Sequence, residues 1–162
     1  KSIYDDSLLE TAKQIIEKSI SLNCEFHLPS DVVVTEDISS SQDSRVCKVS
    51  EIDNNEIGVD IGPETIDQFY EIINGSNTVI WNGPMGIFET EEYSGGTKAV
   101  AEALARMTDT GGLSIICGGD SVSAVRGLNL WNEMTHISTG GGASLELLAG
   151  RELPAMKALE MV

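Results

Sequence analysis

The sequence has few basic residues, few aromatic residues and no long apolar run. Ten lysines and arginines stand against 26 aspartates and glutamates, giving a formal net charge of −16 at pH 7. This acidity argues against nucleic acid and against an anionic membrane as partners, because both would repel the chain. No segment approaches the length of a membrane span, and no secretory signal is visible. The chain also lacks an initial methionine and opens almost directly on a helical pattern, which is typical of an internal piece of a longer protein.

Cysteines are also scarce. Cys24, Cys47 and Cys117 are odd in number and far apart, so they show neither a disulfide framework nor the paired spacing of a zinc site. Unpaired thiols suit a reducing compartment, and we expect a cytoplasmic protein, with an organellar form left open. His27 and His136 lie in apolar, strand-like segments without metal-ligand spacing, so we interpret both as structural.

What the chain does contain is an alternation of strand and helix patterns. At 162 residues with 41% hydrophobic content, it is long enough for one domain with a core. Apolar spacing and turn residues predict helices over residues 5–22, 63–74, 96–107, 122–128, 143–148 and 156–162, and strands over residues 24–28, 31–35, 45–49, 57–61, 78–81, 113–116 and 135–138. The short turn between the first two strands predicts an antiparallel pair at a sheet edge. The whole order predicts an α/β fold: a partial doubly wound, mostly parallel, Rossmann-like sheet with helices on both faces.

Two of these strands run into glycine-rich turns and then directly into helices. The turns are Cys117-Gly118-Gly119-Asp120-Ser121 and Ser138-Thr139-Gly140-Gly141-Gly142. A helix that starts on glycines presents unpaired N–H groups, and the missing Cβ atoms let an anion come close. The alternative is a tight turn in which Ser138 or Thr139 caps the helix. Neither turn has the spaced glycines of a dinucleotide fingerprint or the glycine–lysine ending of a P-loop.

A further loop has the pattern of a family signature and not of a generic connection. Its sequence is Trp81-Asn82-Gly83-Pro84-Met85-Gly86-Ile87-Phe88-Glu89. Together with Gly58-Val59-Asp60-Ile61-Gly62-Pro63 and the two glycine turns, it closely resembles phosphoglycerate kinase, in order along the whole chain. The resemblance implies two doubly wound domains facing each other across a cleft. It covers only the later part of the carboxy-terminal domain. We therefore expect residues 1–162 to be an incomplete carboxy-terminal nucleotide-binding domain, with the amino-terminal substrate domain absent.

The resemblance also implies the reaction, which is reversible phosphoryl transfer between 1,3-bisphosphoglycerate and ADP. The products are 3-phosphoglycerate and ATP, the pathway is glycolysis, and Mg²⁺ accompanies ATP or ADP as the substrate. The family's magnesium ligand corresponds to Asp120, and a carboxylate beside bare backbone donors suits Mg²⁺. The alternative for Asp120 is a helix N-cap.

The other site residues follow from the same resemblance. Gly118, Gly119 and Ser121 would line the nucleotide phosphates through backbone N–H and hydroxyl groups. Glu89 would accept hydrogen bonds from the ribose, although without the resemblance it reads as part of a solvated acidic run. Gly58 would lie against the adenine, and Asn82 and Pro84 would form the wall of the adenine pocket. The amides of Gly140, Gly141 and Gly142 would stabilise the phosphoryl group during its transfer. Cys117 departs from the family pattern, which usually has a third glycine there, and its side chain could crowd the site.

The truncation leads to expectations about activity and partners. We expect the fragment alone to bind nucleotide weakly, to catalyse no transfer and to act only with the missing amino-terminal part. The resemblance also implies that strands of the sheet are missing, and the apolar edge that this would expose predicts self-association. Two alternatives stand beside the enzyme: a nucleotide-binding α/β module without transfer activity, and an acidic structural domain whose glycines serve only turns.

Overall fold

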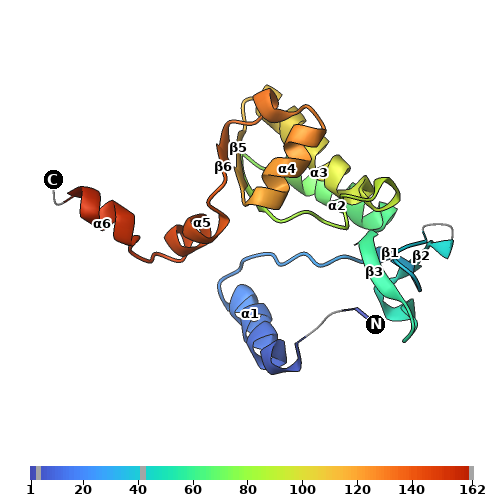
Figure 1. Cartoon of the computed structure of the whole chain (residues 1–162). Helices are drawn as coiled ribbons and strands as arrows, with labels where there is room; N and C mark the ends of the chain where they lie inside the picture. The colour runs from blue at the N-terminus through green and yellow to red at the C-terminus, as the bar shows by residue number, and fades with distance from the viewer. Residues whose placement is uncertain (3–4, 41–42, 161–162) are drawn as a thin grey trace. The chain divides into compact units, whose positions relative to one another are not determined.

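The protein is described by a computed structural model that covers residues 1–2, 5–40 and 43–160 (Figure 1). The chain divides into two compact units, Lys1–Thr65 and Ile66–Val162. Each unit contains one three-stranded sheet. None of the helices in the described part of the chain is long and apolar enough to cross a bilayer.

Helices and strands alternate along most of the chain. In order they are α1 (Leu9–Ser21), β1 (Asp31–Thr35), β2 (Arg45–Lys48), β3 (Ile57–Ile61), α2 (Pro63–Asn74), β4 (Thr78–Asn82), α3 (Gly95–Asp109), β5 (Leu113–Cys117), α4 (Gly119–Gly127), β6 (His136–Ser138), α5 (Gly141–Leu148) and α6 (Pro154–Glu160). Single 3₁₀ turns lie at Asp6–Leu8, Val49–Glu51, Glu91–Tyr93 and Trp131–Glu133. The predicted α/β class is confirmed. The last predicted helix is α6, and its expected end at residues 161 and 162 lies outside the described residues.

The sheet of the first unit is antiparallel, with the strand order β2-β1-β3. Its central strand β1 pairs with β2 on one side and with β3 on the other, and a bulge shifts the second register between Val33 and Val34. Among the described residues of this unit, four apolar side chains are buried, namely Val34, Cys47, Val59 and Ile61. The small apolar interior leaves a larger share of the packing to polar groups.

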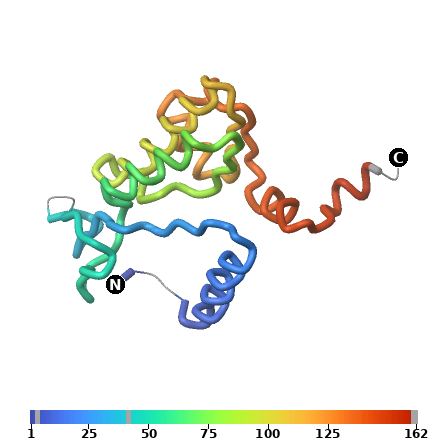
Figure 2. The backbone as a smooth tube through the Cα atoms, turned by 180° about the vertical axis from the view of Figure 1, so that it is seen from behind, coloured from blue at the N-terminus to red at the C-terminus, as the bar shows by residue number. Residues whose placement is uncertain are grey.

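The strand predicted over residues 24–28 is wrong. These residues are β-prone, but all of them are exposed and they lie outside any strand. A β-strand needs a neighbour to satisfy its backbone N–H and C=O groups, and no described strand pairs with this segment. β1 instead pairs with β2 and β3. Helix α1, which precedes the segment, has the expected helical pattern but buries no residue. In Figure 2 it stands apart, as a blue coil, from the strands of its own unit.

The sheet of the second unit is parallel, with the order β4-β5-β6. Side chains alternate between the two faces of a strand, and Trp81 and Ile116 point to the face that carries the hydrophobic core. Helices α2, α3 and α4 and the residue Met134 contribute the rest of this core. Its helical members are Ile73, Val100, Ala101, Ala103, Leu104, Met107, Val122, Ala124 and Val125. Figure 1 shows α3 and α4 on one side of β5 and β6. Helix α5 borders the other face, where it shares a cavity with strand residues.

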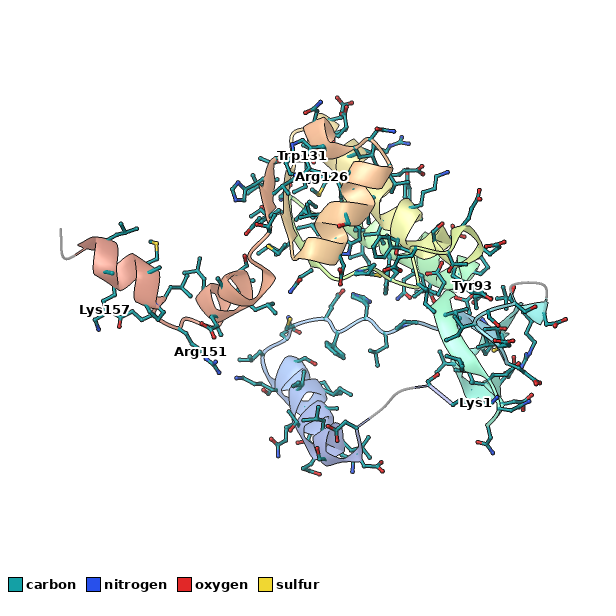
Figure 3. The ribbon with its side chains drawn as sticks, viewed as in Figure 1. Lys1, Tyr93, Arg126, Trp131, Arg151 and Lys157 are labelled. Atoms are coloured by element: carbon teal, nitrogen blue, oxygen red, sulfur yellow. The ribbon has the colours of Figure 1, made fainter. Side chains whose placement is uncertain are left out.

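The end of α4 is fixed by an aromatic contact. The guanidinium carbon of Arg126 lies 4.3 Å from the centre of the Trp131 ring (Figure 3). A cation held over an indole face is attracted by the negative potential of the ring. This contact joins the last turn of α4 to the 3₁₀ turn that leads into β6. It therefore helps to set where the second glycine turn begins.

Candidate functional site

The predicted site motifs of the second unit meet at the carboxyl edge of the parallel sheet. Asn82 on β4 is in register with Cys117 on β5, and Cys117 is in register with Ser138 on β6. The next residues of all three strands therefore leave the sheet at one edge. The Gly118 amide donates a hydrogen bond to the Ser138 carbonyl at 3.1 Å, which ties the two glycine turns together.

Two of the glycines are required by a close approach of backbones. A Cβ on Gly141 would lie 2.9 Å from the Gly118 Cα, and a Cβ on Gly118 would lie 2.6 Å from the Asn82 Oδ1. Gly118 also has a φ of +91°, in the region that residues with a Cβ rarely adopt. Asn82, Gly118 and Gly141 are thus brought together, as the sequence predicts for three residues of one site.

The close approach places two helix amino ends side by side. The first intrahelical hydrogen bonds run from Val122 N to Gly118 O in α4 and from Ser144 N to Gly140 O in α5, both at 3.0 Å. The N–H groups of residues 119–121 and 141–143 are therefore left without intrahelical partners. These amides and the positive ends of two helix dipoles can attract a multiply charged anion. Ser138 Oγ accepts from the Gly140 amide at 3.3 Å, so it orders the turn without capping the first turn of α5.

Asp120 is exposed in the first turn of α4. The predicted alternative, in which Asp120 is the N-cap of a helix that starts at Ser121, is wrong, because α4 already begins at Gly119 and its N-cap is Gly118. Across the described ranges, no three His, Cys, Asp or Glu side chains gather closely enough to hold a metal ion by themselves. A single free carboxylate fits a Mg²⁺ ion that takes its remaining ligands from phosphate oxygens and water.

Two buried hydroxyl groups hold the signature loop in place. Ser121, which has no exposed surface, accepts a hydrogen bond from the Gly83 amide at 2.7 Å. Thr97, on α3, accepts one from the Met85 amide at 3.0 Å. The Ser121 hydroxyl therefore positions the loop, and the residue has no exposed surface that a phosphate could contact. Thr97 was not predicted, because a threonine inside a helical pattern carries no local sign of such a bond.

Glu89, the last residue of the signature loop, lines a cavity of about 360 Å³. The cavity is lined by the loop, by α3 and by α4, including Phe88, Lys98 and Ser123. Ser123 lies one turn after Asp120 on α4. Glu89 and the helix that carries Asp120 therefore border one cavity, although Asp120 itself and the glycines of the two turns do not line it. Pro84 is half-buried in the signature loop.

Gly58 belongs to the first unit, on β3, and its amide donates to the Ser2 Oγ at 3.0 Å. A Cβ added there would meet only this hydroxyl oxygen, at 3.9 Å. Packing among the described residues thus leaves room for a side chain at position 58.

The last glycine of the same motif has an internal explanation that the sequence did not predict. A Cβ on Gly62 would overlap the carboxylate of Asp31, which is buried in β1. That carboxylate accepts hydrogen bonds from the Thr65 amide at 2.8 Å, the Thr65 Oγ at 2.7 Å and the Glu64 amide at 3.1 Å. Burial by itself would raise the pKa of Asp31, but these hydrogen bonds outweigh it and hold the pKa below its ordinary value. Asp31 therefore caps the start of α2 from a strand more than 30 residues earlier in the chain.

Cys117 is buried at the end of β5. Its side chain lines an apolar cavity of about 360 Å³ with Ile80, Ile115 and Leu147, among others. Its bulk is therefore accommodated at the face of the sheet opposite the hydrophobic core.

Comparisons with known proteins agree with the motifs. The family model described as phosphoglycerate kinase matches residues 1–151. The phosphoglycerate kinase of Chlorobium chlorochromatii is 49% identical over 159 residues, which are 98% of this chain and 40% of that protein. The one of Microcystis aeruginosa is 45% identical over 160 residues. A solved structure of phosphoglycerate kinase from Coxiella burnetii matches with a TM-score of 0.89 and 38% identity, covering 97% of this chain and 40% of that one. The chain thus spans about 40% of the length of these relatives.

Proposed function

Because the chain belongs to the phosphoglycerate kinase family, we propose that it is the nucleotide-binding part of a glycolytic phosphotransferase. The proposed reaction transfers a phosphoryl group reversibly between 1,3-bisphosphoglycerate and ADP, giving 3-phosphoglycerate and ATP. The observation that carries the proposal is the contact between Gly118 and Gly141, which sets two helix amino ends side by side. A polyphosphate is the ligand that such a pair of ends would suit best, since each end can take one charged group.

We assign the nucleotide-binding residues as follows. Gly118 and Gly119 line the phosphates, and the Gly119 amide is the donor, because the Gly118 amide already donates to the Ser138 carbonyl. Ser121, the third predicted phosphate residue, has no exposed surface and supports this turn by holding the Gly83 amide. Glu89 accepts hydrogen bonds from the ribose hydroxyls. Asn82 and Pro84 form a wall of the adenine pocket, and Gly58 lies against the base. Asp120 would hold Mg²⁺, which neutralises phosphate charge when it is bound.

The proposed mechanism is a direct, in-line transfer with no covalent enzyme intermediate. The amides of Gly141 and Gly142 stabilise the charge on the phosphoryl group as it moves, and they need no reorganisation because the helix start already fixes them. Gly140, whose amide donates to Ser138 Oγ, forms the turn that presents them. Ser121 and Thr97 act as positioning residues, since they hold the amides of the loop that carries Asn82 and Pro84.

The chain by itself leaves this chemistry incomplete. Neither glycine turn contains a lysine or arginine, and the net charge of −16 opposes a polyphosphate. We therefore propose that the isolated chain binds nucleotide weakly and transfers no phosphate, and that the remaining part of the family polypeptide supplies the acceptor site. A cytoplasmic location would suit the three free cysteines. The second candidate is a nucleotide-binding module without transfer activity, and the incompleteness of the chain is the observation that favours it.

Calorimetric titration of the chain with ADP, with and without Mg²⁺, tests the binding proposal. We expect Mg²⁺ to tighten ADP binding and Asp120→Ala to abolish this dependence. Asp109→Ala is the matched control, because Asp109 is an exposed carboxylate at the end of α3 and should leave binding unchanged. Mg²⁺ dependence that persists in Asp120→Ala would reject the assigned metal ligand.

An activity assay separates the enzyme from the binding module. The purified chain, given 3-phosphoglycerate and MgATP, should show no turnover. Added together with the unmatched part of the Chlorobium chlorochromatii relative, it should form ADP at a rate that Asp120→Ala lowers. Turnover by the chain alone would overturn the proposed incompleteness, and no turnover in the reconstituted mixture would favour the binding module.

A further inference from the structure

The cavity that Glu89 lines differs in composition from the glycine turns at the sheet edge. Its volume of about 360 Å³ is at the small end of the range for small-molecule sites. Its apolar wall consists of Phe88 from the signature loop and of Ala124 and Leu128 at α4 and its end. Phe88 and Leu128 pack against the hydrophobic core, and Ala124 belongs to it. The core therefore holds this wall in place as a fixed apolar surface.

The lining of the cavity also carries charges of both signs. Glu89 and Glu91 are exposed carboxylates, and neither belongs to an ion pair among the described residues. The ammonium group of Lys98 lies 3.9 Å from the Glu102 carboxylate in an exposed pair, which is weak enough to exchange for a ligand. Lys98 also lies in the first turn of α3, at the positive end of the helix dipole. The cavity can therefore attract a cationic group at its carboxylates and an anionic group at Lys98.

The hydroxyl groups of the lining are already engaged. Ser94 Oγ donates to the Glu91 carbonyl at 2.7 Å, and Ser123 Oγ donates to the Gly119 carbonyl at 2.9 Å. A third hydroxyl holds the signature loop. Polar recognition of a ligand therefore depends on the charged side chains. The two carboxylates repel a phosphate dianion, and a simple amine gains nothing from Lys98.

We propose that this cavity binds an α-amino acid with an apolar side chain. The ammonium group of the ligand pairs with Glu89 and Glu91, and its carboxylate pairs with Lys98. Its side chain packs on Phe88 and Leu128. One zwitterion thus satisfies both signs of charge and the apolar wall, and complementarity of this kind gives specificity.

The proposed amino acid site shares Glu89 with the nucleotide site. Under the proposed function this carboxylate accepts hydrogen bonds from the ribose, so an amino acid that occupies it weakens ADP binding. By reciprocity, ADP weakens amino acid binding by the same factor. The antagonism rests on the proposed function, whereas the binding of the amino acid does not.

Titration of the chain with L-phenylalanine, followed by NMR, tests the site without nucleotide. The amide signals of Phe88, Lys98 and Leu128 should shift and saturate. Phenethylamine lacks the carboxylate and phenylpropanoate lacks the ammonium group, so each should bind about fivefold more weakly or worse, because one ionic contact is lost. No saturation by phenylalanine up to about 20 mM, or equal binding of the three compounds, would overturn the proposal.

Two variants locate the ligand, and circular dichroism checks that each is folded. Lys98→Met should weaken phenylalanine binding and leave phenethylamine binding unchanged, because only phenylalanine presents a carboxylate. Arg106→Met is the matched control, since Arg106 is an exposed cation of α3 that does not line the cavity. A Cβ on Gly127, in the cavity lining, would meet no atom within 4 Å, so Gly127→Leu should fill the cavity and exclude all three compounds. Unchanged binding in Gly127→Leu would place the amino acid elsewhere and overturn the proposal.

The antagonism has a separate measurement. Calorimetric titration with MgADP should give a weaker ADP affinity at saturating phenylalanine than without it. An unchanged ADP affinity would overturn the antagonism and leave the amino acid site in place. Absence of ADP binding would contradict the proposed function, and the phenylalanine titration of the unmodified chain would still decide whether the amino acid site exists.

Discussion

The two units of the chain fill their interiors with different chemistry. The second unit buries a continuous aliphatic and aromatic cluster that includes Trp81, Leu104 and Ile116, and its buried polar side chains are the hydroxyls of Thr97, Ser114 and Ser121. The first unit buries fewer apolar side chains. Its buried polar groups include the carboxylates of Asp31, Glu56 and Asp60 and the hydroxyls of Thr35 and Thr65.

This difference in buried groups decides whether acid or a loss of apolar volume destabilises each unit more. In the first unit the Glu56 carboxylate receives two hydrogen bonds from Arg45, at 2.7 and 2.8 Å, and the Arg45 guanidinium holds the pKa of Glu56 below its ordinary value. In the second unit the ion pairs, such as Lys98 with Glu102, join exposed side chains and contribute little. We therefore expect acid to destabilise mainly the first unit and loss of apolar volume to destabilise mainly the second.

The strongest test of this contrast is Leu104→Ala in α3. Leu104 has no exposed surface and lies within the core cluster, so truncation should leave a cavity and lower the free energy of unfolding by about 2–5 kcal/mol. Native-state hydrogen exchange should show faster exchange in α3 and β5, with β1, β2 and β3 unchanged. Leu113→Ala, at the start of β5, is the control and should lower the free energy of unfolding far less, because Leu113 is already partly exposed to water. Equal loss of protection in both sheets would contradict the division.

The same contrast explains how much of the fold could be predicted. The helices and parallel strands around the hydrophobic core of the second unit follow from local spacing, because their apolar side chains pack against one another within the chain. The strand predicted over residues 24–28 failed because a strand depends on a neighbour, and the sequence does not reveal whether one is present. The pairing of β1 with β2 and β3 depends likewise on long-range contacts that no local pattern encodes.

A smaller effect, confined to the first unit, is expected for Asp31→Asn. The amide would keep one acceptor and would turn an N–H group toward the donors of Glu64 and Thr65, which should lower the free energy of unfolding by about 1–3 kcal/mol at pH 7. The folded-state pKa of Asp31 is depressed. Its contribution is therefore complete above the unfolded-state pKa, near 3.9, and is lost as the pH falls through the folded-state pKa. Denaturant unfolding from pH 7 to pH 3 should show a shallower loss of stability in the variant.

Asp37→Asn provides the matched control for this pH series. Asp37 also accepts two hydrogen bonds, from the Ser39 amide at 2.9 Å and the Ser39 hydroxyl at 2.7 Å, but it is exposed. Hydrogen bonds from Ser39 likewise hold its pKa below the ordinary value, yet solvent should reduce the effect on stability. If the two variants lose stability equally, burial is not what makes Asp31 important.

The motifs of the candidate site could be predicted from the sequence, whereas the contacts that hold them in place could not. The glycine turns and the signature loop are contiguous, so their residues could be read directly from the sequence, and Asn82, Gly118 and Gly141 do meet. The groups that hold these motifs in place were not predictable, because the Gly83 amide and the Ser121 hydroxyl are 38 residues apart in the chain. Asp31 and Gly62 are a similar case, since their close approach follows from the pairing of β1 with β3.

The smallest effect is expected for Arg45→Met, which sharpens the comparison at a single ion pair. Without the guanidinium, the Glu56 carboxylate keeps the hydrogen bond from the Asp53 amide at 2.9 Å but loses both hydrogen bonds from Arg45. The pKa of Glu56 should therefore rise toward its ordinary value, which carboxyl-carbon NMR titration can follow directly. A depressed carboxyl pKa stabilises the folded state above the unfolded-state pKa, so the variant should lose less stability than the parent as the pH falls. Arg45→Lys should give an intermediate pKa, because it keeps the charge without the two-pronged geometry. The loss at pH 7 should be smaller than for Asp31→Asn, since Arg45 is half-exposed and screened by salt. A Glu56 pKa that is the same in all three proteins would mean that the backbone, and not the ion pair, sets the acid response of the first unit.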